Sequence, residues 1–135
     1  MIRSKKPKRS LLIPPPAVKV LLAEDNDKLR NLYSGYLTKN GFYVKTASNG
    51  EEALKIILDF KPKVIILDIF MPGMNGLVLL KLLKRTPGLK RIPVIMLTGS
   101  DELLPYCFDN GVKGYVYKGS NTSKELLSKI FHLVG

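Results

Sequence analysis

The stretch Val64-Ile65-Ile66-Leu67-Asp68 decides the fold. Four consecutive apolar residues, three of them β-branched, are typical of a strand covered on both faces, as in a parallel sheet. The run ends in a carboxylate and passes into the turn 69–76. A charge at the end of a buried strand costs free energy unless it is solvated, paired or metal-bound. Because ligands of open α/β sheets bind at this end of the strands, Asp68 is predicted to be a functional residue.

Strand-like and helix-like segments alternate on both sides of this stretch, from residue 17 onward. The apolar runs predict strands over 18–23, 42–47, 64–68, 93–98 and 115–118. Apolar residues at helical spacing predict helices over 26–39, 48–60, 76–85, 100–110 and 122–134. Five strand–helix units predict an α/β fold, a doubly wound five-stranded parallel sheet with helices on both faces.

Local signals mark several helix ends. Ser48–Glu51 and Thr122–Glu125 have the form of capping boxes and predict helix starts at Ser48 and Thr122. Gly41 is expected to end the first helix. Pro105 fits only in the first turn of its helix. The last helix is expected to bury five apolar residues: Leu126, Leu127, Ile130, Phe131 and Val134.

Size and composition predict one intracellular domain. The chain has 135 residues, no apolar run long enough to span a membrane, and no secretory signal. Its single cysteine, Cys107, excludes an internal disulfide and is expected to be a small buried hydrophobe. A cytoplasmic location is therefore expected. Domain boundaries are predicted at 1–16 for a tail and 17–135 for the folded domain.

The net charge of +11 is concentrated in the tail and in one internal cluster. Residues 1–16 hold five bases and no acid, and end in three prolines, which predicts a flexible or extended segment. The other 119 residues carry 17 bases and 11 acids, and segment 81–91 holds five of those bases. The tail is either a solvated leader or a contact for an anionic partner: nucleic acid, anionic lipid or protein.

Polar residues at the ends of four predicted strands form a constellation. Glu24 and Asp25 end the first strand, Asp68 the third, Thr98 the fourth and Lys118 the fifth. A parallel sheet brings these ends to one edge. Two carboxylates about 4 Å apart repel by roughly 4 kcal/mol at an effective dielectric near 20, so three predict a bound cation. Hard oxygen ligands favour Mg²⁺, and Lys118 and Thr98 would contact an anionic group held on Asp68.

Four motifs carry a resemblance to a known family. They are Ala23-Glu24-Asp25-Asn26, the turn Asp68-x-x-Met71-Pro72-x-Met74-x-Gly76, Leu97-Thr98-Gly99 and Tyr115-Val116-Tyr117-Lys118. In order and spacing they resemble the receiver domain of bacterial two-component response regulators, over about residues 17–135. The resemblance implies a flavodoxin-like sheet with strand order 2-1-3-4-5.

The resemblance also implies roles for these residues. Asp68 would accept a phosphoryl group from the phosphohistidine of a sensor histidine kinase or a phosphotransfer protein. Asp25, Asp68 and the backbone carbonyl of Phe70 would bind Mg²⁺ directly, and Glu24 through water. Thr98 and Lys118 would contact the phosphoryl oxygens. Tyr115 would be the aromatic switch that moves inward after phosphorylation.

Two residues depart from the family pattern. Gly119 follows Lys118, where the family usually has a proline in a cis peptide. A non-proline cis bond costs about 2.5–4 kcal/mol, so a trans bond and a different position of Lys118 are expected. Phe70 is bulky and apolar, and we hypothesise that it excludes attacking water and prolongs the phosphorylated state.

The predicted function is that of a phosphoacceptor signalling domain and not an enzyme, although it assists its own phosphoryl transfer and dephosphorylation. Because the chain stops one helix after Lys118, the expectation is a stand-alone receiver without a DNA-binding output domain. A downstream protein is expected on the face between Tyr106 and Lys129, formed by the last two helices and the last strand. The alternative is a degenerate receiver that acts as a constitutive protein-binding module because Gly119 spoils the site.

Overall fold

A five-stranded parallel sheet forms the centre of the molecule. The computed structural model describes residues 17–134, so the predicted tail lies outside the described residues. The strands are β1 (Lys19–Ala23), β2 (Tyr43–Ala47), β3 (Val64–Asp68), β4 (Val94–Thr98) and β5 (Gly114–Tyr117). They are ordered β2-β1-β3-β4-β5, and every pair is parallel. The predicted fold class and strand order are confirmed.

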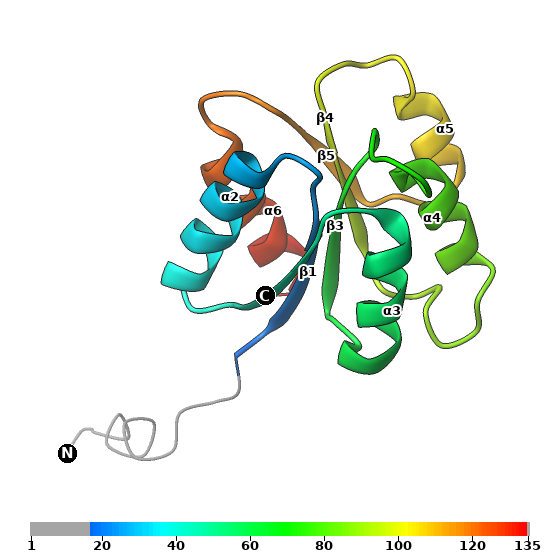
Figure 1. The fold of residues 1–135 in the computed structure, drawn as a ribbon, viewed down its shortest axis with the longest axis horizontal. Coiled ribbons are helices and arrows are strands. Elements are labelled where there is room, and N and C mark those ends of the chain that lie inside the picture. The colour runs from blue at the N-terminus through cyan, green and yellow to red at the C-terminus, as the bar shows by residue number, and fades with distance from the viewer. Residues whose placement is uncertain (1–16, 135) are drawn as a thin grey trace.

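Five helices cover both faces of this sheet. They are α2 (Asp27–Lys39), α3 (Gly50–Phe60), α4 (Gly76–Lys84), α5 (Leu104–Asp109) and α6 (Thr122–Val134). Figure 1 shows α2 and α6 on one side of the sheet and α3, α4 and α5 on the other. Within residues 17–134, no helix is both long and apolar enough to cross a membrane.

Each face has its own hydrophobic cluster. One cluster packs α3, α4 and α5 against Leu21, Ile65 and Leu67, and the other packs α2 and α6 against their strand neighbours Leu22 and Ile66. Successive side chains of a strand point to opposite faces, so the continuous apolar run of β3 serves both clusters. This is why 64–68 is buried throughout.

Asparagine side chains start three of the helices. Asn26, Asn49 and Asn75 each accept a hydrogen bond from the backbone N–H three residues later, at 2.9 Å. The capping box predicted at Ser48–Glu51 is therefore wrong by one residue, because Asn49 is the cap. Glu52 then accepts from the Ser48 N–H at 2.6 Å. The next residue, Gly50, donates its N–H to the Met74 carbonyl.

Two further expectations are corrected at α6 and one is met in α5. Thr122 does not cap Glu125, because the hydroxyl of Thr122 bonds to the preceding loop. Phe131 was expected in the core but is 53% exposed, and its ring contacts Phe42 at the rim. Pro105 lies in the first turn of α5, as predicted, and Cys107 is fully buried.

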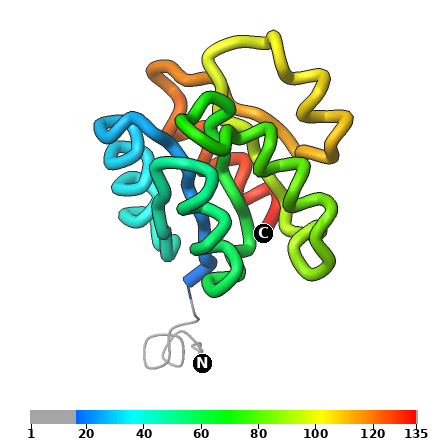
Figure 2. The backbone as a smooth tube through the Cα atoms, turned by 45° about the vertical axis from the view of Figure 1, so that its right-hand side comes forward, coloured from blue at the N-terminus to red at the C-terminus, as the bar shows by residue number. Residues whose placement is uncertain are grey.

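The segment that follows β3 packs closely against neighbouring backbone at Gly50 and Gly76. Figure 2 shows the loops that follow the strands gathered at one end of the molecule, opposite the start of β1. Here the Gly76 N–H donates to the Ile69 carbonyl at 2.9 Å. A Cβ atom at Gly76 would lie 2.1 Å from the Asp68 carbonyl oxygen, and one at Gly50 would lie 2.2 Å from the Met74 carbonyl oxygen. Neither backbone has room for a side chain, so both glycines fix the loop 69–75.

We therefore expect Gly76→Ala to destabilise the fold by more than about 2 kcal/mol, because the methyl group would collide with backbone atoms that cannot move independently. Gly35→Ala is the matched control. No atom lies within 4 Å of a Cβ at Gly35, and alanine in a helix interior is favoured by up to about 1 kcal/mol. Urea denaturation measures both, and equal stabilities of the two variants would contradict the close packing.

Candidate phosphoacceptor site

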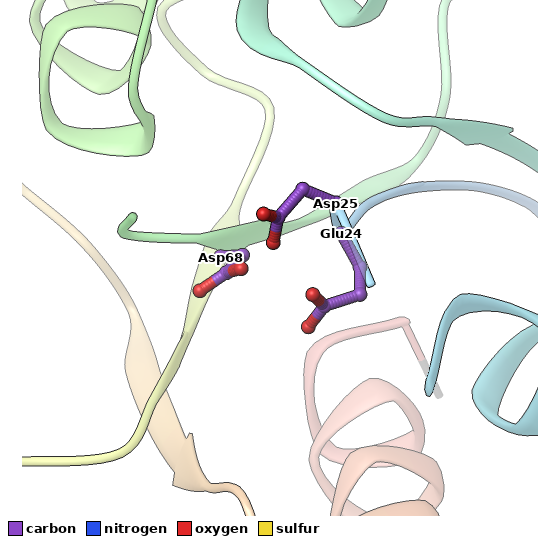
Figure 3. Close-up of side chains that lie close together, drawn as sticks. All are labelled: Glu24, Asp25 and Asp68. Atoms are coloured by element: carbon purple, nitrogen blue, oxygen red, sulfur yellow. The ribbon is translucent and has the colours of Figure 1, made fainter. Parts of the chain in front are cut away.

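Three carboxylates meet at the ends of the two central strands. Glu24 and Asp25 follow β1, and Asp68 ends β3, its direct neighbour in the sheet. One oxygen from each lies within 4.8 Å of the others. Figure 3 shows their side chains turned toward a common space. Glu24 is 0% exposed and Asp68 2% exposed, whereas Asp25 is open to solvent. The structure thus brings together the three acids predicted from the strand ends.

Lys118 supplies the counter-charge for the two buried acids. Its Nζ lies 2.9 Å from Glu24 Oε1 and 3.0 Å from Asp68 Oδ2. Apart from this ammonium, neither oxygen has a hydrogen-bond partner among residues 17–134. The other Glu24 oxygen accepts from the Asn26 N–H at 2.9 Å, and Arg30 donates to the Glu24 carbonyl. Arg30 was not identified from the sequence, because nothing in its spacing sets it apart from other helix-surface bases.

The charges do not balance. Burial and then the Glu24 carboxylate raise the pKa of Asp68 from 3.8 to about 7, although Lys118 acts in the opposite direction. Burial alone lowers the pKa of the Lys118 ammonium, but its contacts with Glu24 and Asp68 outweigh burial and leave it raised. Two buried carboxylates share one ammonium, so the site is short of positive charge.

The donor set fits a hard divalent cation. Carboxylate and carbonyl oxygens in a partly hydrated site are the ligands that Mg²⁺ takes in proteins. The carbonyl of Phe70 accepts no hydrogen bond from residues 17–134, so it is available as a further donor. A cation here would also relieve the charge imbalance around Asp68.

Thr98 and Tyr115 are near this edge but are not engaged with Asp68. Thr98 is buried, and its hydroxyl donates to the Ser100 carbonyl at 2.8 Å and accepts from the Ser100 N–H at 3.2 Å. Tyr115 is half-buried and packs edge-on against Phe108 and Tyr117. The Tyr117 hydroxyl in turn bonds to the Asp101 carboxylate in the loop after β4.

The hydroxyl of Thr122, which was predicted to cap a helix, instead bonds to the loop that carries Lys118. Thr122 is buried and accepts from the Gly119 N–H at 2.7 Å. The same hydroxyl donates to the carbonyl of Tyr117 or Gly119, each 2.9 Å away. No cis peptide bond occurs in residues 17–134, so the bond between Lys118 and Gly119 is trans, as expected. Lys118 nevertheless reaches both acids, because Thr122 holds the loop on either side of it.

Family comparison agrees with this fold. The model of the response regulator receiver domain matches residues 20–131. The chain therefore belongs to the response regulator receiver family of two-component signalling, and is a signalling domain rather than a classical enzyme.

Two curated relatives are longer proteins. The transcriptional regulatory protein AfsQ1 of Streptomyces coelicolor is 33% identical over 101 residues, which cover 73% of this chain and 44% of AfsQ1. The probable transcriptional regulator ycf29 of Pyropia yezoensis is 39% identical over 120 residues, covering 86% of this chain and 53% of that protein. The chain thus spans about half the length of these relatives.

Solved structures of similar size match almost throughout. The chemotaxis response regulator CheY4 of Vibrio cholerae is 30% identical with a TM-score of 0.81, covering 88% of this chain and 100% of its own. A putative response regulator from Chloroflexus aurantiacus is 28% identical with a TM-score of 0.82, covering 87% of this chain and 98% of its own.

The raised pKa of Asp68 predicts an unusual pH dependence in metal-free buffer. Between about pH 4 and 7 the folded protein holds a proton on Asp68 that the unfolded chain releases, so this residue makes stability fall as pH rises. The slope from one group is at most about 1.4 kcal/mol per pH unit. Asp68→Asn should remove this component and gain stability over the parent most at pH 7. Parallel stability–pH curves for the two proteins would contradict the shift.

The Thr122 hydroxyl predicts a contrast between a change that removes the hydroxyl and one that keeps it. Thr122→Val leaves the Gly119 N–H without its partner and should cost about 1–3 kcal/mol of stability, whereas Thr122→Ser should retain most of it. Denaturation curves give this comparison. In NMR spectra, the signals of Lys118 and Gly119 should move in the valine variant and stay close to the parent in the serine variant. Unchanged signals in both would show that the loop does not depend on this hydroxyl.

Proposed function

We propose that Asp68 accepts a phosphoryl group from the phosphohistidine of a sensor kinase or phosphotransfer protein. The observation that supports this most is the position of Lys118 Nζ, 3.0 Å from Asp68 Oδ2 at the mouth of an acidic cluster. An ammonium in contact with the acceptor oxygen is placed to neutralise charge that arrives there. Phosphoryl transfer depends mainly on such positioning and neutralisation.

In the proposed step, an ionised Asp68 oxygen attacks phosphorus as the bond between phosphorus and the donor imidazole breaks. The product is an acyl phosphate on Asp68 and a free histidine on the donor. Lys118 exchanges a carboxylate contact for one with a phosphoryl oxygen. Since Glu24 is buried beside it and retains the Asn26 N–H, Glu24 keeps Lys118 at the site during this exchange.

Mg²⁺ belongs to the same proposal. Asp25, Asp68 and the Phe70 carbonyl would hold it, with Glu24 contacting it through water. When bound, the ion neutralises negative charge on the phosphoryl oxygens and favours the ionised, nucleophilic form of Asp68. Without metal, the raised pKa of Asp68 leaves the acceptor partly protonated near neutral pH, and this is why the proposed transfer needs a cation.

Signalling would follow from the added charge. A phosphoryl group brings about −1.5 to −2 charge, which attracts the Thr98 hydroxyl away from Ser100. Tyr115 then moves toward the space that Thr98 vacates, and the surface around α5 and α6 changes. Three exposed aromatic residues on this part of the molecule, Tyr106, Phe108 and Tyr117, support its assignment as the docking face for a downstream protein.

Phosphorylation tests the proposal directly. Acetyl phosphate with Mg²⁺ should add one phosphoryl group to the parent protein, detected by intact-mass spectrometry, and none to Asp68→Asn. Asp59→Asn, which alters an exposed carboxylate near the end of α3, is the control and should behave as the parent. EDTA should prevent labelling of the parent.

Two results would contradict the proposal in different ways. Equal labelling of Asp68→Asn would place the acceptor elsewhere. No labelling of a folded parent by acetyl phosphate or by any histidine kinase would favour the alternative of a constitutive binding module.

A further inference from the structure

The loops at the carboxyl ends of the strands and the loops at their amino ends carry opposite charge. The loops that lead from a strand to a helix are 24–26, 48–49, 69–75, 99–103 and 118–121, and they hold four acids and one base. The loops that lead from a helix to a strand are 40–42, 61–63, 85–93 and 110–113. They hold no acid and six bases: Lys61, Lys63, Arg85, Lys90, Arg91 and Lys113. The end of the sheet where the strands begin, opposite Asp68, is therefore cationic and is called the cationic edge.

A cavity of about 320 Å³ opens on this cationic edge, between α6 and the start of β4 and β5. Its polar lining consists of Lys113, Ser128, Lys129 and His132, and its apolar lining of Ile95 and Leu133. Among residues 17–134, no carboxylate lines it. All four polar residues of this lining are solvent-exposed and two of them are lysines, so the lining suits an anion.

Two lysine stems pack beside glycines at this end of the sheet. A Cβ at Gly114 would lie 3.5 Å from Lys129 Cδ, and one at Gly111 would lie 3.6 Å from Lys84 Cε. Lys113 stands between these glycines in sequence, and its charge contributes, after burial, to lowering the pKa of Lys84. Like charges are thus held close together by packing of their apolar stems.

These lysines have no acidic partner in the part of the chain that the structure describes. The ion pairs of residues 17–134 involve only Arg30 and Lys118. The Lys84 ammonium donates to the carbonyls of Lys90 and Ile92, at 3.2 and 3.4 Å. Within residues 17–134, no acid forms an ion pair with this cationic cluster, so a bound anion would relieve its repulsion.

We propose that the cavity formed by Lys113, Ser128, Lys129 and His132 binds a phosphate group, as inorganic phosphate or as the phosphate of a small ester. Phosphate oxygens accept strong hydrogen bonds from ammonium groups and from hydroxyls. The volume is at the lower end of the range for ligand pockets, which fits a phosphate with one small substituent. Ile95 and Leu133 offer that substituent an apolar wall.

The end of α6 opposes this binding, since helix C-termini carry partial negative charge. Lys129 and His132 lie in the last two turns of α6 and offset that charge, while Lys113 adds a cation from a different element. Binding of an anion therefore depends on Lys113 and Lys129 together, and substitution of each lysine tests the proposal separately.

The probes are inorganic phosphate, glycerol phosphate and vesicles of phosphatidylglycerol in phosphatidylcholine. Inorganic phosphate or glycerol phosphate, added to the full chain at constant ionic strength and without divalent metal, should move the NMR signals of residues 113–114 and 128–133 in a saturable manner. Tighter binding of glycerol phosphate than of inorganic phosphate would identify a free ester as the ligand. Sedimentation with the anionic vesicles that depends on Lys113 and Lys129 would identify a lipid headgroup.

Variants that remove the charge but keep a polar side chain separate this site from others. Lys113→Gln and Lys129→Gln should each weaken phosphate binding about tenfold, the usual effect of losing one charge-assisted hydrogen bond. Lys55→Gln, in the cavity lined by Ser48 and Pro72, should leave binding unchanged.

Three results would overturn the proposal. One is the absence of saturable binding of any probe at physiological ionic strength. Another is signal movement confined to the edge that holds Asp68. The third is equal binding by the parent and both glutamine variants. None of these would bear on phosphorylation of Asp68, so the two proposals fail independently.

Discussion

The site at the carboxyl ends of the strands depends on one ammonium group, that of Lys118, which the buried carboxylates of Glu24 and Asp68 share. Glu24 and Asp68 end adjacent strands, so the strand order alone brings them together. Lys118 follows β5, which is separated from β3 by β4, a span of two strand spacings or about 10 Å. Its side chain therefore has to reach over the end of β4, and the loop that carries it must be held firmly. The buried Thr122 hydroxyl provides that hold.

The fold was predictable from sequence because its signals are redundant. Each strand is a short apolar run, and the predicted strand ends agree with the structure to within one residue. Errors arose where a local signal had two possible uses. Ser48 and Asn49 are both good helix caps, and the sequence does not show that Asn49 is the one that accepts from the helix. Phe131 follows helical spacing, but it lies on the rim beside Phe42 and not in the core.

The site was predictable only in part, for a related reason. Acids at the ends of β1 and β3 must meet in any parallel sheet, so Glu24, Asp25 and Asp68 could be grouped without a structure. The hydrogen bonds of Thr98 could not be predicted, because a hydroxyl at a strand end can bond to nearby backbone, as Thr98 does to the Ser100 carbonyl. Thr122 was identified as polar and helix-starting, but a sequence does not show whether a hydroxyl bonds forward into its helix or back into a loop.

The glycines around the loop after β3 bear on how such a site can diversify. Gly50 and Gly76 fix the backbone of 69–75, while Phe70 within it points outward and is 62% exposed. A side chain on a fixed backbone and free of core contacts can be exchanged at little cost to folding. Position 70 can thus vary while the fold that presents Asp68 stays the same, and under the proposed function such changes would alter what approaches Asp68 and so how long a signal lasts.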